Sequence, residues 1–185
     1  MWLVWAGVCM GAMLLELSTP MQQHKILDCG FLFVDKYLGG GRLRQGVAAS
    51  VNTLLLTACN VYLLREAYVH GLSPVVQGST LLFLMRAVVG WCTRLPVPVD
   101  FVSSAGEFPP AGYNFFFLFS AHTTTVSTVG LHLYRIYGWG VGGVFVALLG
   151  WQSARLLVTR GHYTSDILVG LLLSWLMDHY THSAC

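Results

Sequence analysis

The sequence predicts an all-α fold, a polytopic membrane protein with about six transmembrane helices in one catalytic domain that covers residues 1–185. Two observations indicate this class. Hydrophobic residues make up 55% of the chain and charged residues 10%, whereas a soluble domain carries roughly 25% charged residues. Apolar runs close to the roughly 20 residues that a membrane helix needs also recur along the chain, separated by polar, proline or glycine clusters.

Composition also excludes other classes of protein. The formal net charge is only +2 and the basic residues are dispersed, so a nucleic-acid-binding protein is excluded. The cysteines are odd in number and lack CxxC spacing, which favours small apolar packing residues over a disulfide framework or a zinc site. They are Cys9, Cys29, Cys59, Cys92 and Cys185.

The first apolar run, 2–17, is short for a membrane span. A signal peptide is the rival interpretation, but no basic segment precedes the run and no clear small-residue cleavage site follows it. A polar and basic connection, 18–46, comes next. The second span is expected at about 47–64, before Arg65 and Glu66, and the third at about 72–93.

Residues 96–113 contain four of the six prolines. Proline lacks the backbone N–H that a spanning helix needs, so this segment is expected to be a loop outside the membrane. The remaining spans are expected at about 114–135, 140–158 and 163–178.

The order of these spans brings two histidines to one face of the membrane. His122 lies near the start of the fourth span and His162 at the start of the sixth. The chain therefore crosses the membrane twice between them, and both imidazoles are expected at a similar depth on the same side.

His162 and Asp166 are four residues apart, a spacing that places two side chains on one helix face. A carboxylate so placed accepts the Nδ1 proton of the imidazole, fixes its tautomer and makes Nε2 a better nucleophile. The pair therefore predicts an oriented, nucleophilic histidine.

Hydroxyl side chains crowd around His122 in the stretch SAHTTTVST, residues 120–128. Polar groups at membrane depth are costly unless they face protein or a wet cavity, so the stretch indicates an interior polar site. For the more distal hydroxyls, ordinary packing between helices is an equally good interpretation.

Arginines complete the predicted site. Arg86 lies within the third span and Arg94 directly after it, and Arg155 and Arg160 precede His162. A guanidinium group matches phosphate oxygens in two-point geometry, so their convergence on the histidines predicts a phosphoester site. For Arg94 and Arg135, a position at a helix end with the charge in the interface is the favoured alternative.

A metal site is the other chemical interpretation of two histidines and an aspartate, which can form a facial triad for iron or zinc. The nearby arginines would repel a cation, so the phosphoester interpretation is favoured and no metal is expected. The other histidines are expected at the interface or in solvent. They are His24, His70, His132, His179 and His182.

Three motifs resemble those of known lipid enzymes. SAHT at 120–123 and RGHYTSDI at 160–167 resemble the S-G-H-T and H-Y-T-x-D motifs of the sphingomyelin synthase branch of the type 2 phosphatidic acid phosphatase superfamily, and RAVVGWCTRLPVP at 86–98 resembles that branch's Arg, Thr and Leu-Pro motif. Over about 80–178, the order and spacing of the blocks more closely resemble the plant-type phosphatidylcholine:diacylglycerol cholinephosphotransferase family. Ala121 departs from the family's usual glycine.

The resemblance implies a helical bundle like that of lipid phosphatases and phosphotransferases, in the endoplasmic reticulum membrane, with His122, His162 and Asp166 as catalytic residues. His162 would attack the phosphorus of phosphatidylcholine, Asp166 would orient it, and His122 would protonate the departing diacylglycerol oxygen. A second diacylglycerol would then take the phosphocholine from the histidine by the reverse of this step.

The resemblance also implies the substrate-binding residues. Arg86, Arg155 and Arg160 would stabilise the phosphate oxygens, and no metal or cofactor would be needed. Tyr163 would contact the substrate, and it is one of several candidates for an aromatic cage around choline, with Trp91, Tyr113, Phe115 and Phe116. The alternative is a place in the membrane interface, where aromatic residues at the ends of spans are more often found. The partners would be phosphatidylcholine, diacylglycerol and the bilayer.

Several alternatives stay open. One is a ceramide-using synthase or a lipid phosphate phosphatase of the same superfamily, and another is a membrane protein without catalytic activity. The basic segment 18–46 favours a cytosolic site, whereas the sphingomyelin synthase resemblance favours a lumenal one. The oligomeric state is also open. In every catalytic interpretation, relay through one phosphorus requires the side chains of His122 and His162 to lie within about 10 Å.

Overall fold

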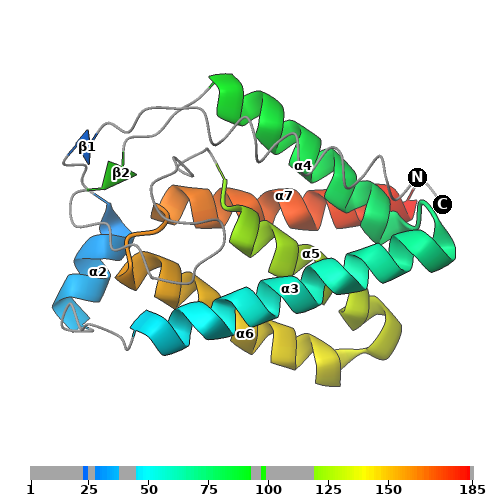
Figure 1. The fold of residues 1–185 in the computed structure, drawn as a ribbon, viewed down its shortest axis with the longest axis horizontal. Coiled ribbons are helices and arrows are strands. Elements are labelled where there is room, and N and C mark those ends of the chain that lie inside the picture. The colour runs from blue at the N-terminus through cyan, green and yellow to red at the C-terminus, as the bar shows by residue number, and fades with distance from the viewer. Residues whose placement is uncertain (1–22, 25–27, 38–44, 93–96, 99–118, 184–185) are drawn as a thin grey trace.

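The computed structural model describes residues 23–24, 28–37, 45–92, 97–98 and 119–183 (Figure 1). These residues form six helices, α2 (Cys29–Tyr37), α3 (Gln45–His70), α4 (Pro74–Cys92), α5 (Ala121–Tyr137), α6 (Trp139–Val158) and α7 (Thr164–Ser183). Two strands of two residues each, β1 (Gln23–His24) and β2 (Val97–Pro98), pair in parallel. The prediction of an all-α fold is therefore confirmed, with this short pairing as an addition.

The ends of the helices differ from the predicted spans. Helix α3 continues past 64 to His70, and α7 continues past 178 to Ser183. The fourth span was expected from 114, but α5 begins at Ala121 because the side chain of Ser120 accepts a hydrogen bond from the backbone N–H of Thr123. Ser120 is therefore the N-cap that sets the start of this helix.

The number of membrane spans is only partly supported. Among the described residues, α6 is the one helix with the length and apolar composition to cross a membrane, and α4 holds a shorter apolar stretch, Pro74–Val89. The expected first span, 2–17, lies outside the described residues, as does most of the loop 96–113. Six crossings are therefore not confirmed.

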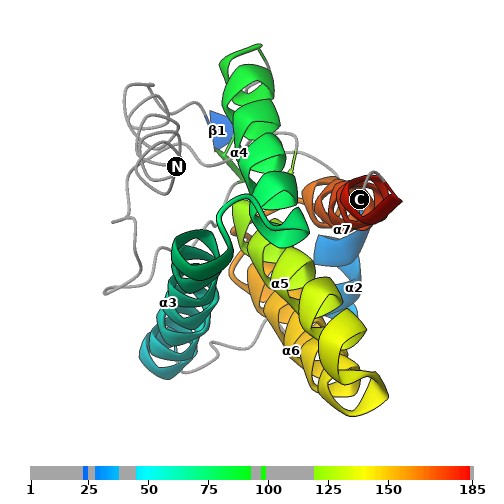
Figure 2. The same ribbon diagram turned by 90° about the vertical axis from the view of Figure 1, so that its right-hand side faces the viewer.

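Helix α5 lies at the centre of the bundle. It packs against α3, α4, α6 and α7, and α6 runs antiparallel beside it (Figures 1 and 2). Its residues 123–130 are all buried, including five with hydroxyl side chains. The polar stretch predicted to face the protein interior therefore does so.

An apolar core lies between α3, α4 and α5. It is formed by Cys59, Leu63 and Ala67 of α3, Val75 and Val76 of α4, and Val126 and Val129 of α5. The α3 members are spaced four residues apart and so share one helix face. Cys59 belongs to this core, in the packing role that its isolation in the sequence predicts.

His132 was expected at the interface or in solvent, and this prediction is wrong. Its side chain is on the central helix α5 and is only 8% exposed. The ring lies 6.0 Å from that of Tyr62 and 6.2 Å from that of His182. A histidine near the end of an apolar run is buried here because neighbouring helices cover α5 on several sides.

Helix α2 lies within the segment that was expected to be a polar connection. Gly30, Phe31 and Val34 form its buried face, and it packs against α6 and α7 at the end of the bundle where those two helices are joined (Figure 1). It therefore borders the segment that contains His162.

Candidate active site

His162 and Asp166 form the predicted pair. His162 lies in the connection between α6 and α7, Asp166 lies in the first turn of α7, and their exposed fractions are 1% and 0%. Nδ1 of His162 is 3.4 Å from Oδ2 of Asp166. The same oxygen accepts a hydrogen bond from the backbone N–H of Tyr163 at 3.1 Å. The carboxylate is thus oriented toward the imidazole, at a separation typical of catalytic contacts before substrate binds.

His122 lies beside His162, as the parity of the spans predicts. The centroids of the two rings are 5.7 Å apart, and the ring planes meet at 66°. Nδ1 of His122 is buried and makes no hydrogen bond to any group in the described part of the chain. One polar atom of this ring is therefore available to a ligand.

Close contact between α5 and α7 fixes the relative positions of the three residues. The backbone N–H of Ser120 donates to the carbonyl of Asp166 at 3.1 Å. A Cβ added at Gly170 would lie 3.1 Å from Oγ1 of Thr124 and 3.3 Å from the carbonyl oxygen of Ser120. The two helices approach this closely because Gly170 has no side chain.

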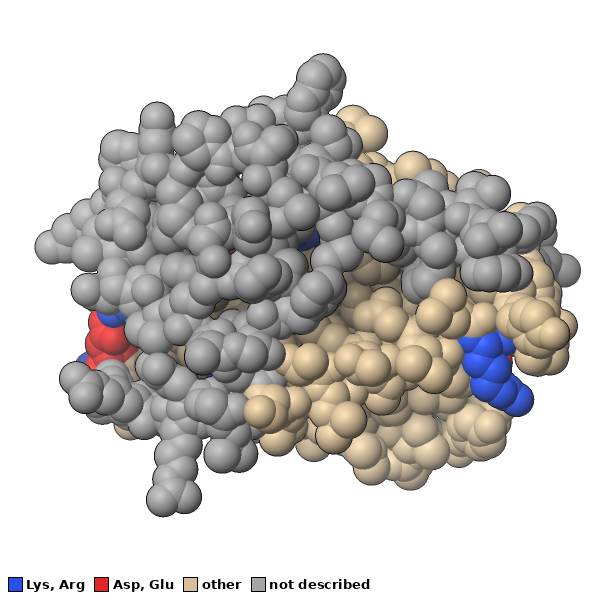
Figure 3. Space-filling model, viewed as in Figure 1, with Lys and Arg blue, Asp and Glu red and all other residues tan. Residues whose placement is uncertain are grey.

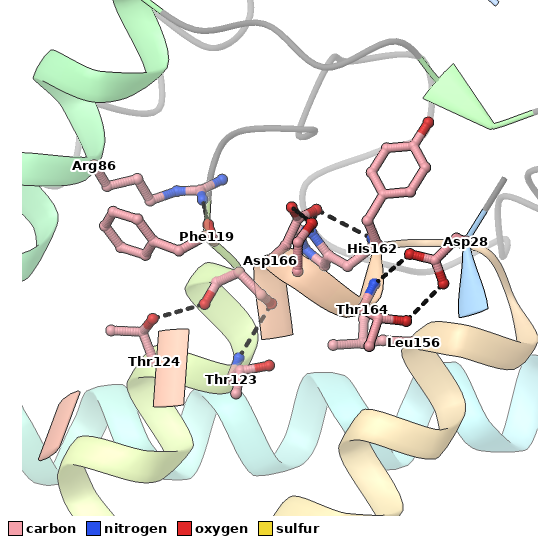
Figure 4. Close-up of polar contacts among 12 residues, drawn as sticks. Asp28, Arg86, Phe119, Thr123, Thr124, Leu156, His162, Thr164 and Asp166 are labelled. Atoms are coloured by element: carbon pink, nitrogen blue, oxygen red, sulfur yellow. Dashed lines mark hydrogen bonds and ion pairs between the residues drawn. The ribbon is translucent and has the colours of Figure 1, made fainter. Parts of the chain in front are cut away.

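Two arginines approach this site. Arg86 of α4 and Arg155 of α6 are 3% and 2% exposed. The guanidinium group of Arg86 donates to the carbonyl oxygen of Phe119, directly before the start of α5 (Figure 4). Cationic side chains buried this deeply in a protein are favourable sites for an anionic ligand.

Burial lowers the pKa of His162 below its ordinary value, and the positive charges of Arg86 and Arg155 lower it further. The hydrogen bond and negative charge of Asp166 act in the opposite direction and are outweighed. The imidazole is therefore neutral at physiological pH, which is the nucleophilic form.

Arg160 lies differently. It is the residue after the C-cap of α6, and its backbone has a φ of 52°. The backbone N–H of Gly161 donates to Leu156 at 2.8 Å and that of Arg160 to Leu157 at 3.1 Å, as in a Schellman motif. Glycine is usual in this left-handed position, so an arginine there is strained.

The guanidinium group of Arg160 binds α2. It donates to Oδ2 of Asp35 at 2.9 Å and lies 5.0 Å from the ring centroid of Phe31. Of the three arginines predicted to bind substrate, Arg86 and Arg155 therefore lie close enough to act on His162, whereas Arg160 is engaged by α2 in this conformation.

Tyr163 is the described aromatic candidate of the predicted choline cage. Its side chain is 4% exposed, and its ring lies 5.6 Å from that of Phe31. Tyr113, Phe115 and Phe116 lie outside the described residues, as do Arg94 and the side chain of Trp91.

Sequence reasoning missed Asp28. Its carboxylate contacts the first residue of α7, two positions from both His162 and Asp166. The available signal was an aspartate directly before a helix, a common N-cap, but α2 itself was not predicted. Among the described residues, no group of three His, Cys, Asp or Glu side chains is arranged to hold a metal ion.

Comparison with known proteins identifies the family. A model of the AtPDCT1/2 family matches residues 27–183. Phosphatidylcholine:diacylglycerol cholinephosphotransferase 1 of Arabidopsis thaliana is 34% identical over 154 residues, which are 82% of this chain and 51% of that protein. Phosphatidylcholine:diacylglycerol cholinephosphotransferase 2 of the same plant is 31% identical over 154 residues, 82% of this chain and 52% of that protein.

The chain thus spans about half the length of these curated relatives, which are named as phosphotransferase enzymes. No solved structure is significantly similar to it. All the predicted site residues lie inside the matched region, and the chain belongs to the AtPDCT1/2 family, as its motifs predict.

Proposed function

We propose that this protein transfers the phosphocholine headgroup from phosphatidylcholine to diacylglycerol through a phosphohistidine intermediate. The names of the two relatives support the substrates. The observation that carries the chemistry is the arrangement of two imidazoles 5.7 Å apart with a buried carboxylate on one of them. This is the set of groups that a nucleophile, its orienting partner and an acid–base residue require.

In the first step, the neutral imidazole of His162 attacks the phosphorus, and the bond from phosphorus to the glycerol oxygen breaks. Asp166 stabilises the positive charge that develops on the ring, and protonated His122 gives its proton to the departing oxygen. In the second step, neutral His122 takes the proton of an incoming diacylglycerol hydroxyl. That oxygen then attacks the phosphorus, and His162 is released.

Arg86 and Arg155 are the proposed ligands of the phosphate oxygens, because they are buried and act on His162. Tyr163 is proposed to contact the headgroup. Arg160 binds phosphate in this scheme only if phosphate oxygens replace Asp35 as its partner.

We also propose that the bundle crosses the endoplasmic reticulum membrane, with six spans. Large apolar side chains are exposed on several helices, including Leu54 at 72%, Val88 at 63% and Val146 at 71%. Such surface is unfavourable in water and favourable in lipid. On the face seen in Figure 3, the charged side chains of the described residues lie mainly toward the two ends of the long axis.

The test is transfer in proteoliposomes that contain headgroup-labelled phosphatidylcholine with diacylglycerol, ceramide or no added acceptor. Label in a new phosphatidylcholine, lost in His162→Ala, supports the proposal. His179→Ala is the matched control, since this exposed histidine lies on α7 and its ring stacks on Trp175. Free phosphocholine as the main product, or label mainly in the ceramide product, would reject diacylglycerol as the acceptor.

A further inference from the structure

We propose that Asp28 is a positioning residue that holds the connection containing His162 in its reactive place by capping α2 and α7 at once. This inference rests on the proposed role of His162 as the nucleophile. Asp28 lies outside every motif that carries the family resemblance and more than 130 residues before the helix that it contacts, since its bonds to Thr164 span 136 positions.

The carboxylate of Asp28 accepts hydrogen bonds at the start of both helices. Oδ1 accepts from the backbone N–H groups of Gly30 at 2.9 Å and Phe31 at 3.1 Å, as the N-cap of α2. Oδ2 accepts from the backbone N–H of Thr164, the first residue of α7, at 2.9 Å. A negative charge at two helix N-termini is doubly favourable, because both expose N–H groups and the positive ends of their dipoles.

The hydroxyl of Thr164 completes the link. It donates to Oδ1 of Asp28 at 2.6 Å and accepts from the backbone N–H of Gly30 at 3.1 Å. Figure 4 shows Asp28 directed at Thr164, next to the pair of His162 and Asp166. A Cβ at Gly30 would overlap Oγ1 of Thr164 in α7 and lie 2.9 Å from Cδ2 of Leu157 in α6. Helix α2 is therefore already at contact distance from both helices.

Helix α2 also holds the residues on both sides of His162. Phe31 contacts Tyr163 with ring centroids 5.6 Å apart, and Arg160 lies over Phe31 at 5.0 Å. These contacts and the Asp28–Thr164 link leave the His162 backbone little freedom to shift. Displacement of a catalytic group by about 1 Å can cost about 100-fold in rate, so even a small displacement of His162 is expected to slow the reaction.

Four variants of the full chain separate positioning from simple stabilisation. Asp28→Ser retains an N-cap for α2 but is too short to reach Thr164. Thr164→Val removes the hydroxyl at nearly constant volume and leaves the carboxylate on α2, so it serves if Asp28→Ser does not fold. Thr164→Ser restores the hydroxyl. Lys36→Gln is the control, an exposed charged side chain on the same helix whose ammonium group lies over the ring of Tyr37.

Three quantities are measured. The first is kcat and KM for diacylglycerol per folded molecule in proteoliposomes, and the second is the midpoint of the acid limb of the pH–rate profile. The third is the rate at which diethyl pyrocarbonate acylates His162. Asp28→Ser and Thr164→Val are expected to lower kcat about 10- to 100-fold without raising KM. A looser connection would admit water to His162, which would raise the pKa of its imidazole and move the acid limb to higher pH. The groups that face His162 in the wild type, which are His122, Asp166, Arg86 and Arg155, are unchanged in these variants. Acylation should be faster in these two variants, while Thr164→Ser and Lys36→Gln resemble the wild type.

Two other outcomes would overturn either this inference or the proposed function. Wild-type kcat, acid limb and acylation rate in folded Asp28→Ser and Thr164→Val would overturn the inference and leave Asp28 as a stabilising cap. Wild-type protein that transfers no phosphocholine would overturn the proposed function instead. The acylation rate does not require turnover, so it would still decide whether Asp28 holds His162 in place.

Discussion

The imidazole rings of His122 and His162 lie 5.7 Å apart, although the residues are 40 positions apart in the sequence. Helices α5 and α6 are antiparallel, so the end of α6 returns to the start of α5. A phosphorus atom between the rings can lie within about 3 Å of one nitrogen while its leaving oxygen lies within hydrogen-bonding distance of the other. The separation thus satisfies the reach that relay through one phosphorus requires.

Asp166→Asn is expected to lower kcat by roughly 10²- to 10⁴-fold, because an amide neither fixes the His162 tautomer nor stabilises an imidazolium ion. The fold should persist, since the amide oxygen can still accept from the Tyr163 N–H. Initial transfer rates per folded molecule test this. Asp178→Asn is the matched control on α7, where the carboxylate pairs with Arg135 at 2.6 Å. Equal losses in both variants would contradict a chemical role for Asp166.

Lysine substitutions distinguish the three arginines. Arg86→Lys and Arg155→Lys are expected to reduce kcat/KM for phosphatidylcholine about 10- to 100-fold, because a lysine cannot reproduce the two-point contact with phosphate. Arg160→Lys is expected to have a smaller effect, since the Arg160 guanidinium binds Asp35. If Arg160→Lys proves the most severe of the three, phosphate must replace Asp35 during turnover.

The pH dependence follows from the lowered pKa of His162. Burial disfavours the protonated ring, so the neutral nucleophile persists below the ordinary pKa of about 6.5. The acid limb of kcat/KM is therefore expected below pH 6.5. His162 also lowers the free energy of unfolding as the pH falls below about 6.5, because its imidazole binds a proton in the unfolded chain that it does not bind in the folded chain. A midpoint at or above 6.5 would contradict a buried, neutral His162.

Two substitutions should move this limb in opposite directions. Arg155→Met removes a positive charge that lowers the pKa of His162, so the midpoint should rise. Asp166→Asn removes a hydrogen bond and a charge that raise it, so the midpoint should fall. Rate profiles of both variants at matched protein levels test the signs. Shifts in the same direction would show that the limb reports another group.

Hydropathy predicted the bounds of α4 and α6 closely because their apolar runs end at polar residues, whereas α3 continues past its predicted end at 64 to His70. It missed α2, which has only nine residues and whose buried face packs against α6 and α7. It also started α5 too early, since apolar residues precede Ser120 and the capping hydrogen bond leaves no trace in hydropathy. Short helices and caps depend on partners that a sequence window does not contain.

The site residues were likewise predicted only in part. The four-residue spacing predicted the contact of His162 with Asp166, although His162 lies in the connection before α7 and not on the helix face that the prediction assumed. Counting spans predicted that His122 would return beside them. The direction of the Arg160 side chain was not predictable, because it depends on a left-handed backbone and on the unexpected helix α2. Asp28 was missed for the same reason.

A buried pair of amide side chains links α3 to α6 and can be tested by substitution. Nε2 of Gln152 donates to Oδ1 of Asn52 at 2.6 Å, and neither side chain is exposed, at 0% each. Gln152→Leu should destabilise the protein by about 1–3 kcal/mol, because it leaves the Asn52 amide buried without this partner. The double variant with Asn52→Leu should recover much of that loss, since no polar group is then stranded. Denaturant unfolding of the purified protein in detergent measures the coupling. Strictly additive losses would show that the two amides do not stabilise each other.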